Sequence, residues 1–402
     1  MSDKPRRLRL DDEQRFDWLR LIRSENVGPR TFRELIGRYG GARAALEALP
    51  ELARRGGAKR TIRIAAPQEI EREFALALKL GVRFIALGEP EYPPALRQID
   101  SAPPILALLG REEALQQPAV AIVGSRNASA AGLTFADRLA RGLGQEGYIV
   151  VSGLARGVDQ RAHVAALETG TVGVLAGGHA KPYPPEAVAL LPRIAEYGAI
   201  VSEMPVEWDP RGRDFPRRNR IVCGLALGTI VVEAARGSGS LITARFAAEQ
   251  NREVFAVPGS PLDPRAEGTN ELLREGANLC ARLEDVLSVL DPLRARNPFA
   301  GLEEGPSVRG GLSWSESEAF GDDPDAGPGA PIDEETVDDS DATTRRRIEA
   351  LLGPSPVSID DLVRAADAPA REVRAVLIEL ELAGRVERRG DRLALTAPDA
   401  DR

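Results

Sequence analysis

The sequence contains few of the residues that mark metal centres and disulfide frameworks. It has two cysteines, Cys223 and Cys280, without CxxC spacing, and two histidines, His163 and His179, without further ligand residues clustered around them. This scarcity argues against a zinc site or a disulfide-stabilised fold and favours a reduced compartment. We therefore predict a cytoplasmic protein that has no metal site.

Hydrophobic segments that would direct the chain to a membrane are also missing. No apolar run approaches the about 20 residues that a membrane-spanning helix needs. The N-terminal sequence MSDKPRRLRLDDEQ is basic, but it lacks the apolar stretch that follows in a signal peptide. We expect no membrane contact.

The common signatures of nucleotide cofactors do not occur. The first long apolar strand is followed by Gly124-Ser125-Arg126 rather than GxGxxG, and no acidic residue ends the second strand to hold a ribose, which argues against NAD or FAD. The segment Ser238-Gly239-Ser240 lacks the Gly-Lys-Ser/Thr of a P-loop. The sequence therefore predicts no cofactor.

The net charge of −8 conceals an uneven distribution. Between Glu303 and Asp341 there are thirteen acidic residues and one basic residue, so the rest of the chain sums to about +4. An acidic total therefore does not exclude a nucleic-acid partner, because the local surface decides what binds.

A chain of 402 residues is too long for one core, and its composition changes suggest four segments. Residues 1–90 are expected to be helical. Within them Val27-Gly28-Pro29-Arg30 resembles the turn of a helix-hairpin-helix, in which a glycine turn approaches a DNA phosphate. A plain helical packing domain is the alternative interpretation, because any pair of antiparallel helices can use a Gly-Pro turn.

Residues 91–292 alternate continuous apolar strands with helical segments. This alternation predicts a doubly wound, mostly parallel, Rossmann-like α/β core. A short apolar run at 105–109 is expected to form an edge strand. The core strands are expected at 119–123, 148–151, 172–175, 199–201, 229–232 and 254–257, and the helices at 130–145, 158–168, 186–196, 218–227 and 241–250.

The last two segments differ sharply from the core. Residues 293–341 are acidic and rich in Gly, Pro and Ser, which predicts a disordered linker. Residues 342–402 show the helix–strand–helix–helix–hairpin order of a winged helix. DNA contact and protein contact by this domain stay open, because its recognition-like helix carries Glu372, Glu379 and Glu381 as well as Arg371 and Arg374.

Short polar motifs follow the apolar strands of the core. Because the carboxyl ends of parallel strands meet at one edge of a sheet, the motifs should form one crevice. Glycines, hydroxyls and arginine forks are suited to binding phosphates. The residues concerned are Gly124, Ser125 and Arg126; Ser152, Gly153 and Gly157; Arg217, Arg218, Asn219 and Arg220; and Ser238, Gly239 and Ser240.

No catalytic set emerges from the remaining polar residues. Asp159 and His163 lie four residues apart on one helix face, where they are either an acid–base or metal pair or, as we favour, structural hydrogen-bonding residues. Ser202 and Glu203 follow one strand, and Glu233 follows another. The two glutamates can be bases or acceptors that position the arginines.

Taken together, the motifs resemble the DprA/Smf family, also called DNA-processing protein A. The family pattern AIVGSR matches 121–126, VSGLAxGxDxxAH matches 151–163, FPxRNR matches 215–220 and SGSLxTA matches 238–244. Further matches are a Gly-Gly turn with Tyr-Pro, SE, VVEA and VFAVPG, in order from about residue 92 to 281.

This resemblance implies a protein that binds single-stranded DNA and is not an enzyme. It implies protection of incoming strands and loading of RecA recombinase in natural transformation, partly against single-strand binding protein, and a homodimer. The crevice residues would then contact DNA. The chain departs from the family between Gly178 and Tyr183, where Lys181 is the candidate for a basic residue that the family often places after Tyr-Pro.

Two other hypotheses stay open. In one, the crevice binds a nucleotide and Glu233 acts as a base in hydrolysis of the lysine-decarboxylase-like type, which rests on fold analogy. In the other, the chain is chiefly a scaffold whose winged helix docks a protein.

Overall fold

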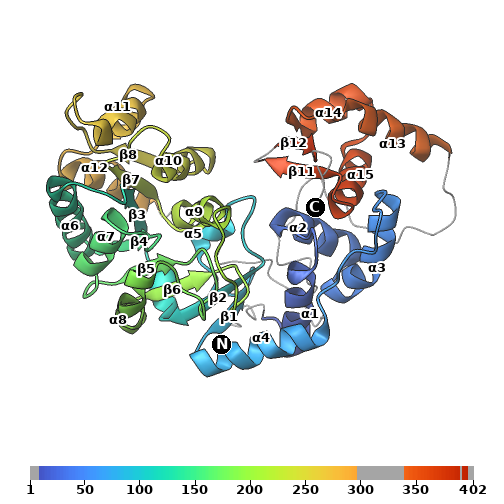
Figure 1. Ribbon diagram of the computed structural model, residues 1–402, viewed down its shortest axis with the longest axis horizontal. Coiled ribbons are helices and arrows are strands. Elements are labelled where there is room, and N and C mark those ends of the chain that lie inside the picture. Colours follow the sequence, from blue (N-terminus) through green and yellow to red (C-terminus); the bar gives the residue numbers. More distant parts are fainter. Residues whose placement is uncertain (1–8, 297–338, 390–391, 397–402) are drawn as a thin grey trace, which may run out of the picture. The chain divides into compact units, whose positions relative to one another are not determined.

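The computed structural model describes residues 9–296, 339–389 and 392–396, and they form two compact units. The first unit contains residues 71–296, and the second contains residues 10–70 together with the described C-terminal residues from 339 onward (Figure 1). Most of the linker predicted at 293–341 lies outside the described residues.

The first unit is built on one sheet of nine strands in the order β1-β2-β6-β5-β4-β3-β7-β8-β9. Every neighbouring pair from β6 to β9 is parallel, and β2 pairs antiparallel with both β1 and β6. The doubly wound, mostly parallel core is therefore confirmed. The strands are β1 (Arg83–Ala86), β2 (Ile105–Gly110), β3 (Ala119–Gly124), β4 (Ile149–Ser152), β5 (Thr171–Val174), β6 (Ala199–Ser202), β7 (Gly228–Val232), β8 (Glu253–Ala256) and β9 (Asn278–Leu279).

The strand order reverses direction at β3. The chain runs outward from β3 through β4 and β5 to β6, returns to the other side of β3 at β7, and continues to β8. Since parallel crossovers are right-handed, the helices before and after the return cover opposite faces of the sheet. The helices are α6 (Ala130–Gln145), α7 (Val158–Ala165) and α8 (Leu191–Tyr197) before it, α9 (Asp214–Gly224) in the returning connection itself, and α10 (Gly239–Glu249) after it.

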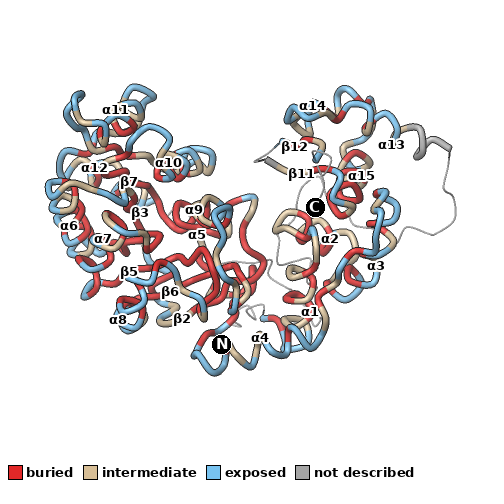
Figure 2. The backbone as a smooth tube through the Cα atoms, in the orientation of Figure 1, coloured by how far each residue is buried: buried red, intermediate tan, exposed pale blue. Residues whose placement is uncertain are grey.

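One hydrophobic core of this unit lies on the α6–α7 face. Side chains of α6, α7 and α12 (Leu283–Ala295) pack there against buried strand residues such as Val120, Ile122 and Ile230. On the other face α9 and α10 pack against each other and α10 covers β7. Figure 2 shows the buried strands between helices whose outer sides are exposed. The other elements of this unit are α5 (Pro94–Arg97), η1 (Glu112–Leu115), η2 (Pro185–Leu190), η3 (Pro264–Ala266) and α11 (Glu267–Arg274).

Two expectations near the start of the core were wrong. Residues 83–86, expected to belong to the helical domain, form β1 at the edge of the large sheet, where Phe84 pairs with Ala107. Consequently β2, expected at an edge, lies between β1 and β6. A strand of four residues gives too short a period to be distinguished from the end of the preceding helix.

The N-terminal part of the second unit consists of helices, as predicted. The Asp11 side chain accepts a hydrogen bond from the Gln14 N–H, and the Gln14 side chain accepts one from the Asp11 N–H. This capping box begins α1. Pro29 begins α2 after Gly28, because a proline at the first helical position loses no hydrogen bond. The helices are α1 (Asp12–Arg23), α2 (Pro29–Tyr39) and α3 (Ala42–Arg55), followed by α4 (Pro67–Leu80), whose residues from 71 onward belong to the first unit.

The C-terminal part is a winged helix, which confirms the prediction. Its three short strands pair in the order β10-β12-β11, and its core contains Ile348, Leu362, Val373 and Leu377. The hairpin tip predicted at residues 390–391 lies outside the described residues. The elements are α13 (Asp339–Leu351), β10 (Val357–Ser358), α14 (Ile359–Ala366), α15 (Ala370–Leu382), β11 (Val386–Arg389) and β12 (Arg392–Leu395).

Hydropathy of the helices bears on the membrane prediction. Among the helices that the structure describes, none is long and apolar enough to cross a membrane.

The core predicts a clear difference between two apolar truncations in the first unit. Phe255 on β8 is fully buried, whereas Leu262 is 92% exposed. We expect Phe255→Ala to lower the free energy of unfolding by about 3–5 kcal/mol, because it removes buried contacts and leaves a cavity. Leu262→Ala should change it by less than about 0.5 kcal/mol. Chemical denaturation followed by circular dichroism measures both, and equal losses would contradict this core assignment.

Candidate functional site

A small cavity lies beyond the carboxyl ends of β3, β4 and β5. Its volume is about 170 Å³, and it opens at the sheet edge where the crevice was predicted. It is lined by Arg126, Asn127, Gly153, Ala155, Arg156, Ala176, Tyr183, Pro184, Phe215 and Arg218. Three of the predicted site residues, Arg126, Gly153 and Arg218, therefore meet here, although they come from three different segments of the chain.

Arg218 forms the buried base of the cavity. Its Nη1 donates to the carbonyl oxygens of Gly153 and Val174, and its Nε donates to Asn219 Oδ1 at 3.1 Å. A Cβ atom on residue 153 would lie 2.5 Å from the guanidinium, so only glycine allows this approach. Burial lowers the pKa of Arg218 to about 10, which leaves the group cationic at neutral pH.

Arg126 adds a second cation at the mouth of the cavity. Burial is the main cause of the lowered pKa of Arg218. The charge of Asp159 raises this pKa, and the charge of Arg126 lowers it further. The two guanidinium groups thus repel each other across the site. A bound anion would relieve this repulsion, and a phosphate oxygen is an acceptor suited to arginine.

Aromatic side chains form one wall of the cavity. The rings of Tyr183 and Phe215 meet edge to face with their centroids 5.4 Å apart, and Arg126 Cζ lies 5.8 Å from the Phe215 centroid. Neither ring was predicted as a site residue from the sequence, in which aromatic residues make up only 4% of the chain. Their positions next to Pro184 and Pro216, inside two of the matched motifs, were the available signal.

Asp159 and His163 have separate structural partners. Asp159 Oδ2 accepts from the backbone N–H groups of Gly153 and Ala155 at 3.2 and 3.3 Å, which fixes the loop after β4. His163 Nδ1 lies 2.7 Å from Thr171 Oγ1. Burial raises the pKa of Asp159 to about 6 and lowers the pKa of His163 to about 3, so this imidazole is neutral at pH 7. This arrangement agrees with the structural interpretation that we favoured.

Glu203 binds two of the predicted arginines away from the cavity. Its buried carboxylate forms ion pairs with Arg220 and, at 3.1 Å, with Arg217. Arg220 is itself buried and also donates to the Ser101 carbonyl. Ser202, which precedes Glu203, donates to the Gly177 carbonyl at 2.7 Å. The three arginines of this motif are thus divided: Arg218 lines the cavity, and Arg217 and Arg220 pair with Glu203.

The predicted anion nest lies at the start of α10 and is not part of the cavity lining. Ser238 Oγ and Ser240 Oγ lie 2.8 Å apart, and Asn219 Nδ2 donates to the Gly239 carbonyl at 3.3 Å. The amide of Asn219 therefore joins the middle of α9 to the first turn of α10.

Glu233 is engaged at the start of α6. Its φ angle is +53°, and its two carboxylate oxygens accept from the backbone N–H (2.8 Å) and the hydroxyl of Ser129. A carboxylate at a helix N-terminus is stabilised by the helix dipole. This geometry supports a structural role and gives no support to Glu233 as a hydrolytic base.

The remaining predicted residues lie around the cavity. Ser152 is buried and donates to the Ile122 carbonyl at 2.6 Å, so its hydroxyl supports the strands. Ser125 Oγ accepts from the Asn127 N–H at 3.1 Å in the turn after Gly124. Gly157 has a φ of +79°, which favours glycine, and Lys181 is exposed outside the cavity lining.

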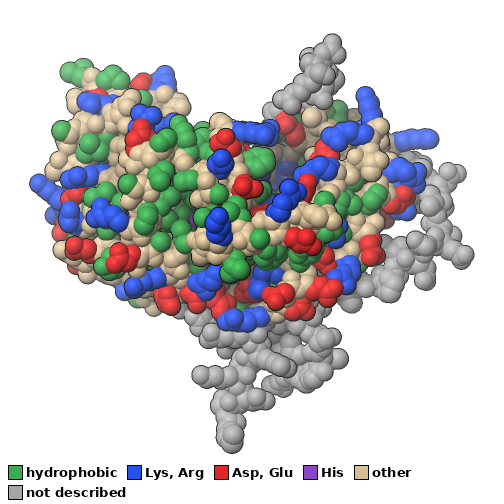
Figure 3. Space-filling view, turned by 60° about the horizontal axis from the view of Figure 1, so that its bottom comes forward, with side chains coloured by type: hydrophobic (Ala, Val, Ile, Leu, Met, Phe, Trp, Pro, Cys, Tyr) green, Lys and Arg blue, Asp and Glu red, His purple; other side chains and the backbone are tan. Residues whose placement is uncertain are grey.

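The charge on the surface is mixed. On the face that Figure 3 shows, basic and acidic side chains are interspersed. A phosphate ligand would therefore be held by particular arginines and backbone groups at the site. Within the described ranges no group of three or more His, Cys, Asp or Glu residues is placed to hold a metal ion.

Comparison with known proteins identifies the class to which this fold and site belong. Residues 83–291 match the family described as DNA recombination-mediator protein A. Residues 12–75 match the DprA-like N-terminal HHH domain, and residues 333–392 match the DprA winged helix domain. The chain therefore belongs to the DprA/Smf family of DNA recombination-mediator proteins.

Individual relatives resemble the chain over most of its length. It is 34% identical over 357 residues to the putative DNA processing protein DprA of Mycobacterium tuberculosis, which covers 85% of this chain and 83% of that protein. It is 39% identical over 225 residues to DNA processing protein DprA of Bacillus subtilis, covering 55% and 76%. The X-ray structure of DprA from Streptococcus pneumoniae matches with a TM-score of 0.58 and 31% identity, covering 70% and 99%.

The buried ion-pair cluster predicts a stability effect. Glu203→Ala leaves the buried Arg220 guanidinium without its carboxylate, so we expect the free energy of unfolding to fall by about 3–5 kcal/mol. Glu207→Ala, four residues away and exposed, should have little effect. Urea denaturation measures both variants. A Glu203→Ala protein as stable as Glu207→Ala would show that the pair does not support the fold.

Proposed function

We propose that this chain binds single-stranded DNA at the cavity beyond β3, β4 and β5, and that it mediates recombination by protecting the strand. The observation that carries the proposal is the pair of mutually repelling cations, Arg126 and buried Arg218, at an opening with one aromatic wall. Such a site favours an anion beside an unstacked base, which a single strand offers and a duplex does not.

The size of the cavity favours one unit of a polymer as the ligand over a whole cofactor. Its volume of about 170 Å³ is below the range of about 300–1,000 Å³ that is typical of small-molecule sites. One unit of an extended polymer needs only part of its surface enclosed. Contacts to phosphates from Arg126 and from the turn at Gly124 carry no base information, so we expect binding with little sequence preference.

A strand needs more than one contact point. We infer that Ser238, Gly239 and Ser240 at the start of α10 hold a neighbouring phosphate, with Asn219 fixing that turn to α9. Arg217 stays half exposed despite its pairing with Glu203, and it is placed to add charge nearby. Lys181 is a further exposed candidate on the loop before Tyr183.

The wider role follows from family membership. The matched family is described as a recombination mediator, and relatives are named DNA processing proteins. We therefore propose RecA recombinase as the protein partner, with single-strand binding protein as the competitor on the strand, in natural transformation or related recombination. A homodimer is part of this proposal, as is a cytoplasmic, non-enzymatic role.

Fluorescence anisotropy with labelled single-stranded and duplex oligonucleotides, across a salt series, tests the central claim. Preferential binding to the single strand that weakens steeply with salt is expected, because bound phosphates release counterions. Equal binding to both forms, or none, would reject the proposal. Incubation with nucleoside monophosphates, followed by chromatography for free base, tests the hydrolase hypothesis directly.

Arg126 gives the sharpest single-residue prediction. Arg126→Ala should weaken single-strand affinity about tenfold, since a hydrogen bond to a charged group contributes about 1.5–3 kcal/mol. It should also reduce the slope of log affinity against log salt by about 0.7, the value for one phosphate contact on a single strand. Arg193→Ala, an exposed arginine outside the cavity, is the control. Unchanged affinity and slope for Arg126→Ala would remove the assignment.

A further inference from the structure

Helix α15 of the winged helix has two buried faces. Val373, Val376, Leu377 and Leu380 belong to the core of the winged helix itself. Ile378, Glu379, Glu381 and Leu382 are also buried but do not belong to that core. At 100° per residue the second set lies on the opposite side of the helix from the first. Something other than the winged helix therefore covers it.

The covering element is the N-terminal helical domain of the same unit. Helix α15 packs beside α3, and the two segments come so close that a Cβ atom on Gly56 would lie 1.8 Å from the Glu379 carbonyl oxygen. The same atom would lie 2.8 Å from Ala383 Cβ. Gly56 has a φ of −64°, so its lack of a side chain serves this approach and not a special backbone conformation.

Polar groups of the two domains satisfy one another across this contact. Thr31 Oγ1 donates to the buried Glu381 Oε2 at 3.0 Å, and Arg388 Nε donates to its Oε1 at 2.7 Å. Asn26 Nδ2 donates at 3.0 Å to the carbonyl of Leu382, one of the last carbonyls of α15 that the helix itself leaves without a partner. Because both partners of each bond are held in place, the contact is specific.

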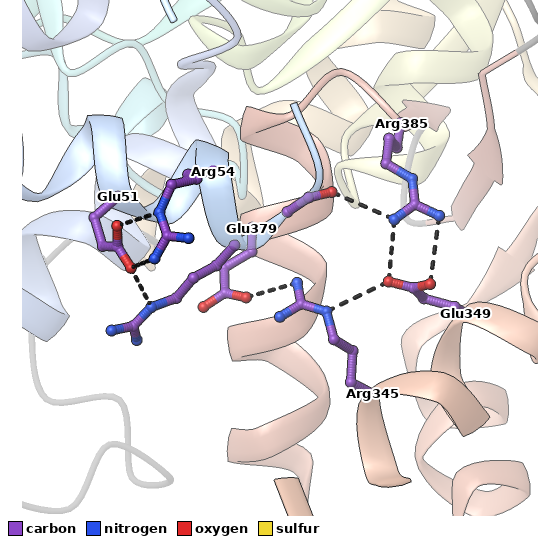
Figure 4. A network of polar contacts seen from close by, with 8 residues as sticks. Glu51, Arg54, Arg345, Glu349, Glu379 and Arg385 are labelled. Atoms are coloured by element: carbon purple, nitrogen blue, oxygen red, sulfur yellow. Dashed lines mark hydrogen bonds and ion pairs between the residues drawn. The ribbon is translucent and has the colours of Figure 1, made fainter. Parts of the chain in front are cut away.

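An ion-pair network borders the contact. Figure 4 shows Arg345 bridging Glu349 and Glu379, Arg385 opposite Glu349, and the Glu51–Arg54 pair of α3. Arg385 Nη1 also donates to the Gly56 carbonyl at 3.4 Å, which links the network to the helical domain.

The covered surfaces belong to the two elements that these motifs would bring to nucleic acid. In a winged helix the second helix of the helix-turn-helix enters the major groove. In the helical domain Asn26 and Thr31 flank the turn at Gly28, and both are bonded to α15. The Glu381 carboxylate beside that turn would also repel a phosphate.

We propose that the Ile378–Leu382 face of α15 is a protein-docking surface whose partner is the helical domain of the same chain, and that docking withholds both α15 and the α1–α2 turn from duplex DNA. This site is separate from the cavity in the first unit. Release of the winged helix exposes both motifs at once.

The test compares two variants of the full-length protein. A leucine at Gly56 cannot fit beneath the Glu379 carbonyl, so Gly56→Leu should separate the domains. Gly37→Ala is the control, because a Cβ there has no atom within 4 Å. Spin labels at Glu47→Cys and Arg371→Cys, two exposed positions, report the interdomain distance, since both native cysteines are buried.

We expect a narrow distance distribution in the parent and in Gly37→Ala, and a longer, broader one in Gly56→Leu. Duplex affinity should rise about tenfold in Gly56→Leu, as expected if about nine molecules in ten are docked in the parent. Arg385→Glu, which removes the donor to the Gly56 carbonyl and places a carboxylate beside that oxygen, is the second undocking variant and guards against a misfolded Gly56→Leu.

Three results would overturn the proposal. A broad distribution in the parent means that the domains are not docked. A narrow distribution in both undocking variants means that the contact at Gly56 is wrong. A broadened distribution with unchanged duplex affinity means that docking masks no DNA-binding surface.

Glu34 on α2 gives docking a pH dependence. Its Oε2 is buried without a hydrogen-bond partner among the described residues. It faces Arg388 from β11, Glu381 and Arg374 from α15, and Arg30 from its own helix. Burial raises the pKa of Glu34 to about 7; Arg388 opposes this rise and Glu381 adds to it.

Because the docked pKa lies above that of a solvated glutamate, docking is strongest when Glu34 is protonated and weakens as pH rises through about 7. Between pH 6 and 8 the docking equilibrium should fall about tenfold. The spin-label distances should therefore broaden over this range in the parent and stay constant in Glu34→Gln. A parent that does not respond to pH would show that Glu34 is not buried by docking.

Discussion

The buried guanidinium of Arg218 is the constraint around which the candidate site is arranged. It comes from α9, yet it donates to carbonyl groups that follow β4 and end β5, so it ties the ends of two strands to this helix. Asp159 holds the same loop from the other side through two backbone N–H groups. A charge buried in this way is costly unless it is hydrogen-bonded, which explains why Gly153 must be a glycine. The positions of Arg126, Tyr183 and Phe215 around the opening depend on this fixed base.

Much of this core was predictable from the sequence because of one topological rule. Parallel strands end at a common edge, so the motifs after 119–123, 148–151 and 172–175 had to approach one another. Their grouping around the cavity follows from strand order alone. The sequence did not distinguish arginines that line the opening from arginines that are buried in ion pairs. Arg218 and Arg220 are two residues apart on α9, yet one reaches strand-end carbonyls and the other reaches Glu203.

The less predictable features depend on contacts between distant segments. Residues 83–86 have too few positions for a strand period, and only their pairing with β2 defines them. Glu379 and Glu381 on α15 had the composition of a solvated helix face. Their burial requires Thr31, Arg345 and Arg388, which come from other helices and a strand. Residue type predicts that most glutamates are exposed, but it does not predict which glutamates are buried beside a partner.

The double-faced helix α15 affects how this winged helix behaves when it is cut away from the rest of the chain. Separation from the helical domain would bring Ile378 and Leu382 into water together with the Glu381 carboxylate, which would lose Thr31. An isolated fragment would thus carry a new apolar stripe, a surface of the kind that promotes self-association. Fragment solubility and fragment dimers would then reflect the cut, and the intact chain would be the reliable material for assigning a role to this domain.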